Sequence, residues 1–139
     1  GTRLFGEGQL GGDVTVASNA WLQAGADSAC GTLTVGGDLT LEPGARLAYR
    51  FGQAGSNDTV IVGGHLTLAP SGTVQASTIS TDVAAPTRDA FIATADAIDG
   101  PANLSGWSVE GVERASLKYS ADRTVIYFIV TRGTLLLLR

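Results

Sequence analysis

One pattern of residues occurs twice between Gly31 and Val74, and it limits the folds that this chain can adopt. The first copy reads GTLTVGGDLTLEPGARL from Gly31, and the second reads DTVIVGGHLTLAPSGTV from Asp58. A weaker third copy begins upstream at Gly11. The paired glycines of the three copies are separated by 25 and then 27 residues. A period of this length is typical of a solenoid, in which each repeat buries its apolar face only against its neighbours.

Apolar residues alternate with Thr and charged residues inside each copy, which is typical of β-strands that bury one face. The alternation places Arg46 and Arg50 on the outer face and predicts an outer ladder of Thr15, Thr40 and Thr67. The side chains expected to point into a common core are Leu33, Val35, Leu39, Leu41, Leu47, Tyr49, Phe51, Val60, Val62, Leu66, Leu68 and Val74.

The strands of each copy are separated by short breaks that contain glycine or proline. Gly36-Gly37 and Gly63-Gly64 are expected to supply positive φ angles, and Glu42-Pro43-Gly44 reads as a turn. Three strands and three breaks in each repeat describe one triangular coil. An antiparallel sandwich has a similar number of strands but does not require a repeat of constant length. The sequence therefore predicts an all-β fold, a parallel β-helix with three sides.

The repeat is lost after residue 76, so we predict one continuous domain with two parts. Residues 1–76 are expected to form about three β-helix coils, and residues 77–139 a loop and a C-terminal cap. Ser77 to Arg88 is polar and contains a proline, which indicates a long loop. Arg88 to Ile98 contains many alanines, but it is bounded by Pro86 and Gly100-Pro101 and is predicted to form a strand.

A β-hairpin is predicted near the C-terminus. Its strands are Ala115 to Tyr119 and Thr124 to Val130, joined by a four-residue loop. The second strand is apolar on both faces, so we expect it to be covered on both sides. Thr134 to Leu138 would add one more strand. Such a hairpin would cover the exposed strand edges at the end of the solenoid.

Composition excludes several classes of function. The net charge is −4, and no two Lys or Arg residues are adjacent, so nucleic acid is not an expected partner. The longest apolar runs, Val125 to Val130 and Leu135 to Leu138, are far shorter than the roughly 20 residues of a membrane-spanning helix. Cys30 is the single cysteine, so an internal disulfide is impossible. The chain does not begin with Met, and we interpret it as part of a longer protein.

Candidate catalytic, cofactor and metal residues have simpler interpretations. Gly6 to Gly11 matches GxGxxG, but an alternating strand rather than a helix follows it. His65, the only histidine, lacks a nucleophile or companion ligands at suitable spacing and is expected to be a surface turn residue. Asp13 and Asp38 could stack as an acid pair, but their positions beside glycines indicate turn residues. We therefore expect no catalytic residue, no cofactor and no metal.

The two tryptophans are the remaining candidates for binding. Trp21 occupies the outward position that Arg46 holds in the next copy, where an exposed ring could stack on a sugar. We therefore name Trp21 as a candidate glycan contact, with packing against a neighbouring loop as the alternative. Trp107 is expected to pack within the cap.

Two sequence segments resemble the repeat of passenger domains of bacterial autotransporters and of autotransporter-associated β-strand proteins. They are GTLTVGGDLTLEPGA, from Gly31, and GSNDTVIVGG, from Gly55. The tail is similar to the end of such passengers in AFIATADAIDG from Ala90, in WSV from Trp107 and in RTVIY from Arg123. The likeness covers roughly residues 11–138.

The resemblance implies a right-handed β-helix at the surface of a Gram-negative bacterium, outer-membrane associated or secreted. It also implies a C-terminal region that helps the passenger to fold. We therefore expect a non-enzymatic structural module, a stalk and folding nucleus, whose partner is the rest of its own passenger chain. The alternative is an adhesin-type module that binds host or extracellular-matrix glycans or proteins. A polysaccharide-degrading β-helix is a more distant third hypothesis.

Overall fold

The computed structural model describes residues 3–6, 8–25, 30–51, 57–78 and 88–130. These residues form strands and connecting turns, and none of them is helical. The strands are β1 (Arg3–Gly6), β2 (Gly8–Leu10), β3 (Val14–Val16), β4 (Trp21–Ala24), β5 (Thr32–Val35), β6 (Leu39–Leu41), β7 (Ala45–Phe51), β8 (Thr59–Val62), β9 (Leu66–Leu68), β10 (Gly72–Thr78), β11 (Arg88–Thr94), β12 (Trp107–Glu110), β13 (Ala115–Tyr119) and β14 (Val125–Val130).

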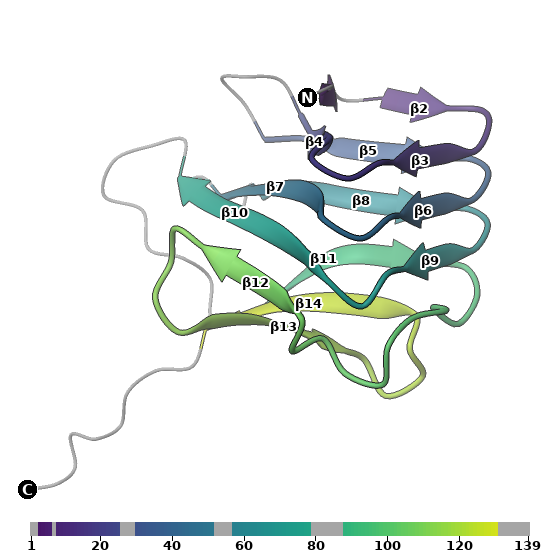
Figure 1. Ribbon diagram of the computed structural model, residues 1–139. Coiled ribbons are helices and arrows are strands. Elements are labelled where there is room, and N and C mark those ends of the chain that lie inside the picture. The colour runs from purple at the N-terminus through teal and green to yellow at the C-terminus, as the bar shows by residue number, and fades with distance from the viewer. Residues whose placement is uncertain (1–2, 7, 26–29, 52–56, 79–87, 131–139) are drawn as a thin grey trace, which may run out of the picture.

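Three sheets receive these strands in rotation (Figure 1). Sheet A has the order β1-β4-β7-β10-β12, sheet B the order β13-β14-β11-β8-β5-β2, and sheet C the order β3-β6-β9. The chain visits sheets B, C and A in turn, which gives three coils: β2 to β4, β5 to β7 and β8 to β10. All strand pairs between these coils are parallel. The fold is therefore all-β and β-helix-like.

Equivalent residues of successive repeats lie side by side. Leu39 is paired with Leu66 in parallel register, and Thr40 lies between Thr15 and Thr67. The threonine ladder predicted from the alternation is therefore confirmed. This register follows from the repeat, because a shift by one residue would turn every inward side chain outward.

The inward residues predicted from the alternation form the core. Each of them is at most 5% exposed, and a buried Leu or Val side chain stabilises the fold by about 1.5 to 3 kcal/mol. Tyr49 lies at the centre of an aromatic cluster. Its ring centroid is 4.8 Å from that of Phe91 and 4.4 Å from that of Phe128. Because Phe91 and Phe128 belong to β11 and β14, this cluster joins the regular coils to the C-terminal part of the domain.

Arg50 lies on the outer face of β7, as predicted, but it is buried there. Arg50 is 7% exposed, although it alternates with the inward residues Tyr49 and Phe51 on β7. Its burial is stabilised by an ion pair with Asp58, which the strand pattern does not show. Arg46, the other outward arginine of β7, is half-buried.

The paired glycines do not have the positive φ angles that we expected. Positive φ occurs at Gly44, with a value of 82°, but not at Gly36-Gly37 or Gly63-Gly64. The pairs are needed because neighbouring corners stack closely. A Cβ atom on Gly64 would lie 2.3 Å from the Asp38 side chain and 2.8 Å from the Gly37 carbonyl oxygen. Close backbone approach therefore explains the repeated glycines.

The coil continues beyond the last repeat. β11 pairs in parallel with β8, and β12 pairs in parallel with β10. Between them, Asp99 forms a bridge to Thr67 of β9, in place of a full strand of sheet C. A fourth coil is thus present where the sequence period is lost, and the strand predicted from Arg88 is confirmed. Residues 79–87 of the predicted loop lie outside the described residues.

The C-terminal hairpin is confirmed. β13 and β14 are antiparallel, and β14 is also antiparallel to β11, so the hairpin reverses the strand direction at the end of sheet B. One face of β14 is buried through Ile126 and Phe128, whereas Val125, Tyr127 and Ile129 are half-buried, so the second face is only partly covered. The further strand predicted at Thr134 to Leu138 lies outside the described residues.

Candidate functional site

The outer face of sheet A contains the first candidate site. Trp21 on β4 is half-buried, and the Arg46 guanidinium lies 5.5 Å from its ring centroid. Ala48 is in register with Gln23 on one side and Gln75 on the other. The short alanine between the two long amides leaves a hollow of about 260 Å³, lined by Trp21, Gln23, Ala48, Arg50, Gln75 and Ser77. An aromatic ring beside amide and hydroxyl groups is a combination that can bind a polar ring compound.

A buried polar cluster that includes Arg50 adjoins this hollow. The Asp58 carboxylate accepts hydrogen bonds from Arg50 Nε at 2.8 Å, Arg50 backbone N at 3.1 Å and Gly31 N at 3.2 Å. Arg50 Nη2 also donates to the Ala24 carbonyl oxygen at 2.9 Å, so the pair joins three turns of the chain. Cys30 lies next to it, with Sγ 3.4 Å from the Arg50 carbonyl oxygen.

The electrostatics of this cluster favour a structural role. Burial raises the pKa of the Asp58 carboxyl group, and the hydrogen bonds and charge of Arg50 offset part of this rise. Burial and the nearby Asp58 charge also raise the pKa of the Cys30 thiol. A raised pKa keeps the thiol protonated at neutral pH, which is the opposite of what a nucleophilic cysteine requires. Sequence analysis missed this pair, because Asp58 reads as part of an ordinary Asn-Asp turn.

The acidic residues at the corners act as backbone caps. Asp13 Oδ1 accepts a hydrogen bond from Asp38 N at 2.8 Å, and Asp38 Oδ1 accepts one from His65 N at 2.9 Å. His65 occupies the third position of this ladder, and its exposed imidazole lies 3.4 Å from Asp96. The interpretation of these residues as surface turn residues therefore agrees with their positions.

The buried Tyr49 side chain is also fixed by a hydrogen bond to a carboxylate. The Tyr49 hydroxyl donates a hydrogen bond to Asp89 Oδ2 at 2.7 Å. Burial, followed by this carboxylate, raises the pKa of Tyr49 far above its ordinary value. The hydroxyl group therefore remains a proton donor to Asp89, which fixes β11 against β7. In the described part of the chain, no three His, Cys, Asp or Glu side chains lie together as metal ligands.

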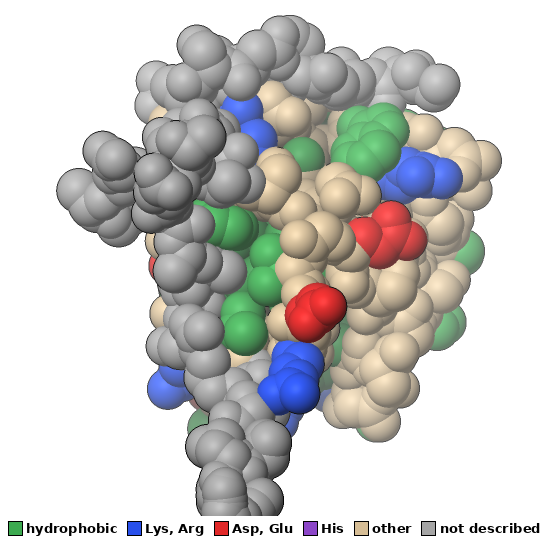
Figure 2. Space-filling view, turned by 90° about the vertical axis from the view of Figure 1, so that its left-hand side faces the viewer, with side chains coloured by type: hydrophobic (Ala, Val, Ile, Leu, Met, Phe, Trp, Pro, Cys, Tyr) green, Lys and Arg blue, Asp and Glu red, His purple; other side chains and the backbone are tan. Residues whose placement is uncertain are grey.

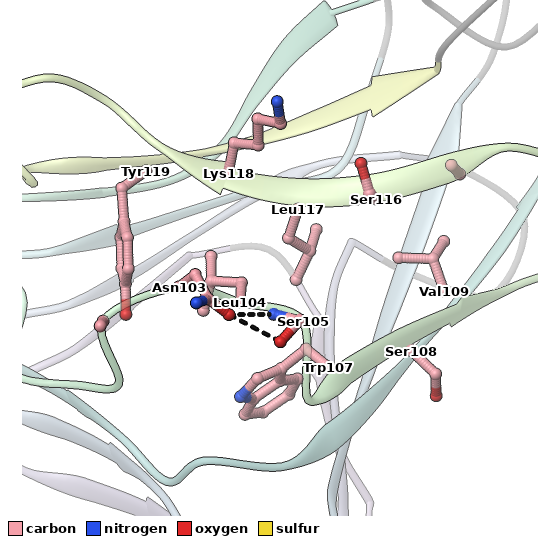
Figure 3. Close-up of a pocket in the computed structure, with 12 residues that line it drawn as sticks. Asn103, Leu104, Ser105, Trp107, Ser108, Val109, Ser116, Leu117, Lys118 and Tyr119 are labelled. Carbon is pink, nitrogen blue, oxygen red and sulfur yellow. Dashed lines mark hydrogen bonds between the residues drawn. The ribbon is translucent and has the colours of Figure 1, made fainter.

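The C-terminal end has a larger cavity, of about 610 Å³, between β12 and β13 (Figure 3). Leu117 points from β13 toward Leu104 and Trp107. Trp107 is 3% exposed and donates from Nε1 to the Ala69 carbonyl oxygen at 2.9 Å, so its predicted packing within the C-terminal region is confirmed. The loop before β12 is stabilised by Asn103, which accepts hydrogen bonds from Ser105.

Charged side chains do not form a stripe of one sign on the face shown in Figure 2. Acidic and basic groups lie close to one another there, and hydrophobic side chains come into view beside the residues drawn in grey. The described ranges contain no helix that is long and apolar enough to cross a membrane. Comparison with protein-family models finds none that matches this chain, and comparison with curated proteins finds no significant match.

Proposed function

We propose that this chain is a non-enzymatic structural module, the C-terminal coils and cap of an autotransporter-like passenger. In this proposal the coils are right-handed, as is usual for crossovers between parallel strands. The passenger is exposed on the surface of a Gram-negative bacterium or secreted from it. Residues 1–76 supply stalk coils, and residues 77–139 supply the loop and the capping region that nucleates folding.

The observation that favours this function is the difference between the two ends. At the N-terminal end, the described edges of β1, β2 and β3 have strand partners on one side only. A cavity of about 250 Å³ lies beside them and is lined by residues that include Leu4, Val14 and Ala20. Such an end is suited to receive a preceding coil of the same kind. At the C-terminal end of sheet B, the antiparallel strands β13 and β14 interrupt the parallel stacking of the coils.

The capping region is also attached to the rest of the fold by specific contacts. The Arg123 guanidinium lies 4.1 Å from the Tyr119 ring centroid and 3.3 Å from the carbonyl oxygens of Ile98, Gly100 and Pro101. Ile98 N in turn donates to the Arg123 carbonyl oxygen at 2.7 Å. These contacts join the hairpin turn to the fourth coil, which supports a role for the hairpin in completing the folded domain.

Two deletions test this function. Removal of residues 124–139 takes away β14, which contributes Phe128 to the aromatic cluster, and should cause aggregation or loss of cooperative unfolding. The matched control removes residues 1–10, which takes β1 and β2 from the end that is already open. This control should unfold cooperatively with a lower midpoint. The proposal is wrong if the chain without residues 124–139 melts as the full chain does.

The hollow beside Trp21 supports a second candidate function, that of an adhesin-type module for host or matrix glycans. A sugar ring stacked on Trp21 would lie within reach of the amides of Gln23 and Gln75. Reproducible binding on a glycan array that Trp21→Ala abolishes would favour this function over the structural one. Trp21→Phe is the control, since it retains an aromatic face. Arrays that stay blank for the folded chain would exclude the glycan function.

A further inference from the structure

The cavity between β12 and β13 is bounded by the last strands of two sheets. Among the described residues, β12 pairs only with β10, and β13 pairs only with β14. Each strand therefore has one edge whose backbone N–H and C=O groups lack a strand partner in the described structure. Unpaired edges of this kind accept an added strand readily.

The deepest part of this groove is apolar, and its lining also includes the polar residues Asn103, Ser105, Ser108, Ser116 and Lys118. Leu104, Trp107 and Leu117 form its most deeply buried part, and Val109 and Ala115 are half-buried along it. An apolar group that covers these half-buried side chains would remove apolar surface from water, which stabilises the folded chain. The space also has the size of a short peptide segment rather than of a single water molecule.

The chain leaves the described structure close to this groove. Val130, the last residue of β14, is in register with Ala115, which lines the groove. The three residues that follow, 131–133, can span roughly 10 Å when extended, and they include a glycine. Leu117 lies two residues along β13 from Ala115, or roughly 7 Å. A segment that starts at Thr134 is therefore within reach of the groove.

The sequence of that segment matches the groove. Thr134 to Leu138 contains four leucines and no charge, and its five residues equal the length of β13. As a strand, it would direct alternate leucines to the same side. We propose that Thr134 to Leu138 occupies the groove between β12 and β13 as an added strand and covers the apolar lining with two of its leucines.

Thiol accessibility tests this placement directly. In a Cys30→Ser background, Val109→Cys places a thiol inside the groove (Figure 3), and Glu110→Cys places one at an exposed position of β12 that does not line it. Truncation after Gly133 should increase the rate of alkylation at position 109 severalfold and leave the rate at position 110 unchanged. Equal rates at position 109 in the full and truncated chains would overturn the proposal.

Two full-length variants keep the test valid if truncation impairs folding. One carries Leu135→Asp and Leu137→Asp, and the other carries Leu136→Asp and Leu138→Asp. A docked strand predicts that one pair exposes the thiol at position 109 and that the other pair does not. If neither pair changes the alkylation rate, the proposal fails. If protection at position 109 disappears on dilution, a second copy of the chain occupies the groove, and the proposal is also wrong.

Discussion

The Arg50 guanidinium and the Asp58 carboxylate form an ion pair at 2.8 Å in which both side chains are buried. Arg50 lies near the end of β7, the last strand of one coil, and Asp58 immediately precedes β8, the first strand of the next. The pair therefore fixes the position at which the chain enters β8. Asp58 N also donates to the Arg50 carbonyl oxygen at 2.9 Å. Backbone and side chains therefore define this junction together.

Loss of one partner of this pair should strongly destabilise the domain. Arg50→Met leaves the Asp58 carboxylate buried without its cation, and we expect the free energy of unfolding to fall by about 3 to 5 kcal/mol. Arg46→Met is the matched control on the same strand, because Arg46 is half-buried over Trp21, and a loss below about 1 kcal/mol is expected. Urea denaturation measures both. Similar midpoints for the two variants would contradict a structural role for the pair.

A methyl group at Gly72 should disturb the packing of the fourth coil. A Cβ atom there would lie 2.3 to 2.7 Å from ring atoms of Trp107, so the indole must shift. We expect Gly72→Ala to cost about 1 to 3 kcal/mol and to change the emission of Trp107 in a Trp21→Phe background. Gly12→Ala provides the control, since its Cβ would meet nothing within 4 Å. Unchanged stability and emission in Gly72→Ala would show that the tryptophan packs elsewhere.

The corner ladder should depend on an acceptor rather than on a charge. Asp38→Ala removes the oxygen that accepts from His65 N, and we expect a loss of about 0.5 to 1.5 kcal/mol. Asp38→Asn retains an oxygen at the same place and should recover most of the stability. Thermal and urea unfolding measure this difference. If Asn is as damaging as Ala, the carboxylate charge rather than the hydrogen bond stabilises the corner.

The repeat made the regular coils predictable. Inward residues such as Leu39 and Leu66 follow from alternation, and their pairing follows from the constant spacing. The fourth coil was not predicted, because its sheet C position is filled by a single bridge at Asp99 instead of an apolar strand. The conformation of the glycine pairs was also mispredicted, since close stacking between coils cannot be read from one copy alone.

The candidate sites were only partly predictable. Trp21 was identified from its outward position, but the hollow beside it depends on Ala48 lying between two glutamines of other coils. The Arg50–Asp58 pair was missed because alternation assigns Arg50 to the outer face. In retrospect, the signal for a buried pair is the position of Arg50. It lies between two inward aromatic residues of one strand and eight residues before Asp58.

Acid should remove a small stabilising contribution from the hairpin turn. Thr124 and Ser120 donate hydrogen bonds to the exposed Asp122 carboxylate, and they lower its pKa below the ordinary value of about 3.9. A lowered pKa in the folded state means that stability is present above the unfolded pKa and is lost as pH falls through the folded pKa. Asp122→Asn should therefore be less stable than the parent at pH 7, and the difference should vanish in acid below the folded pKa.

Urea unfolding of both chains between pH 7 and pH 2 measures this difference, with Ser120→Ala expected to reduce it. A gap that stays constant across this range would show that the charge of Asp122 does not stabilise the turn.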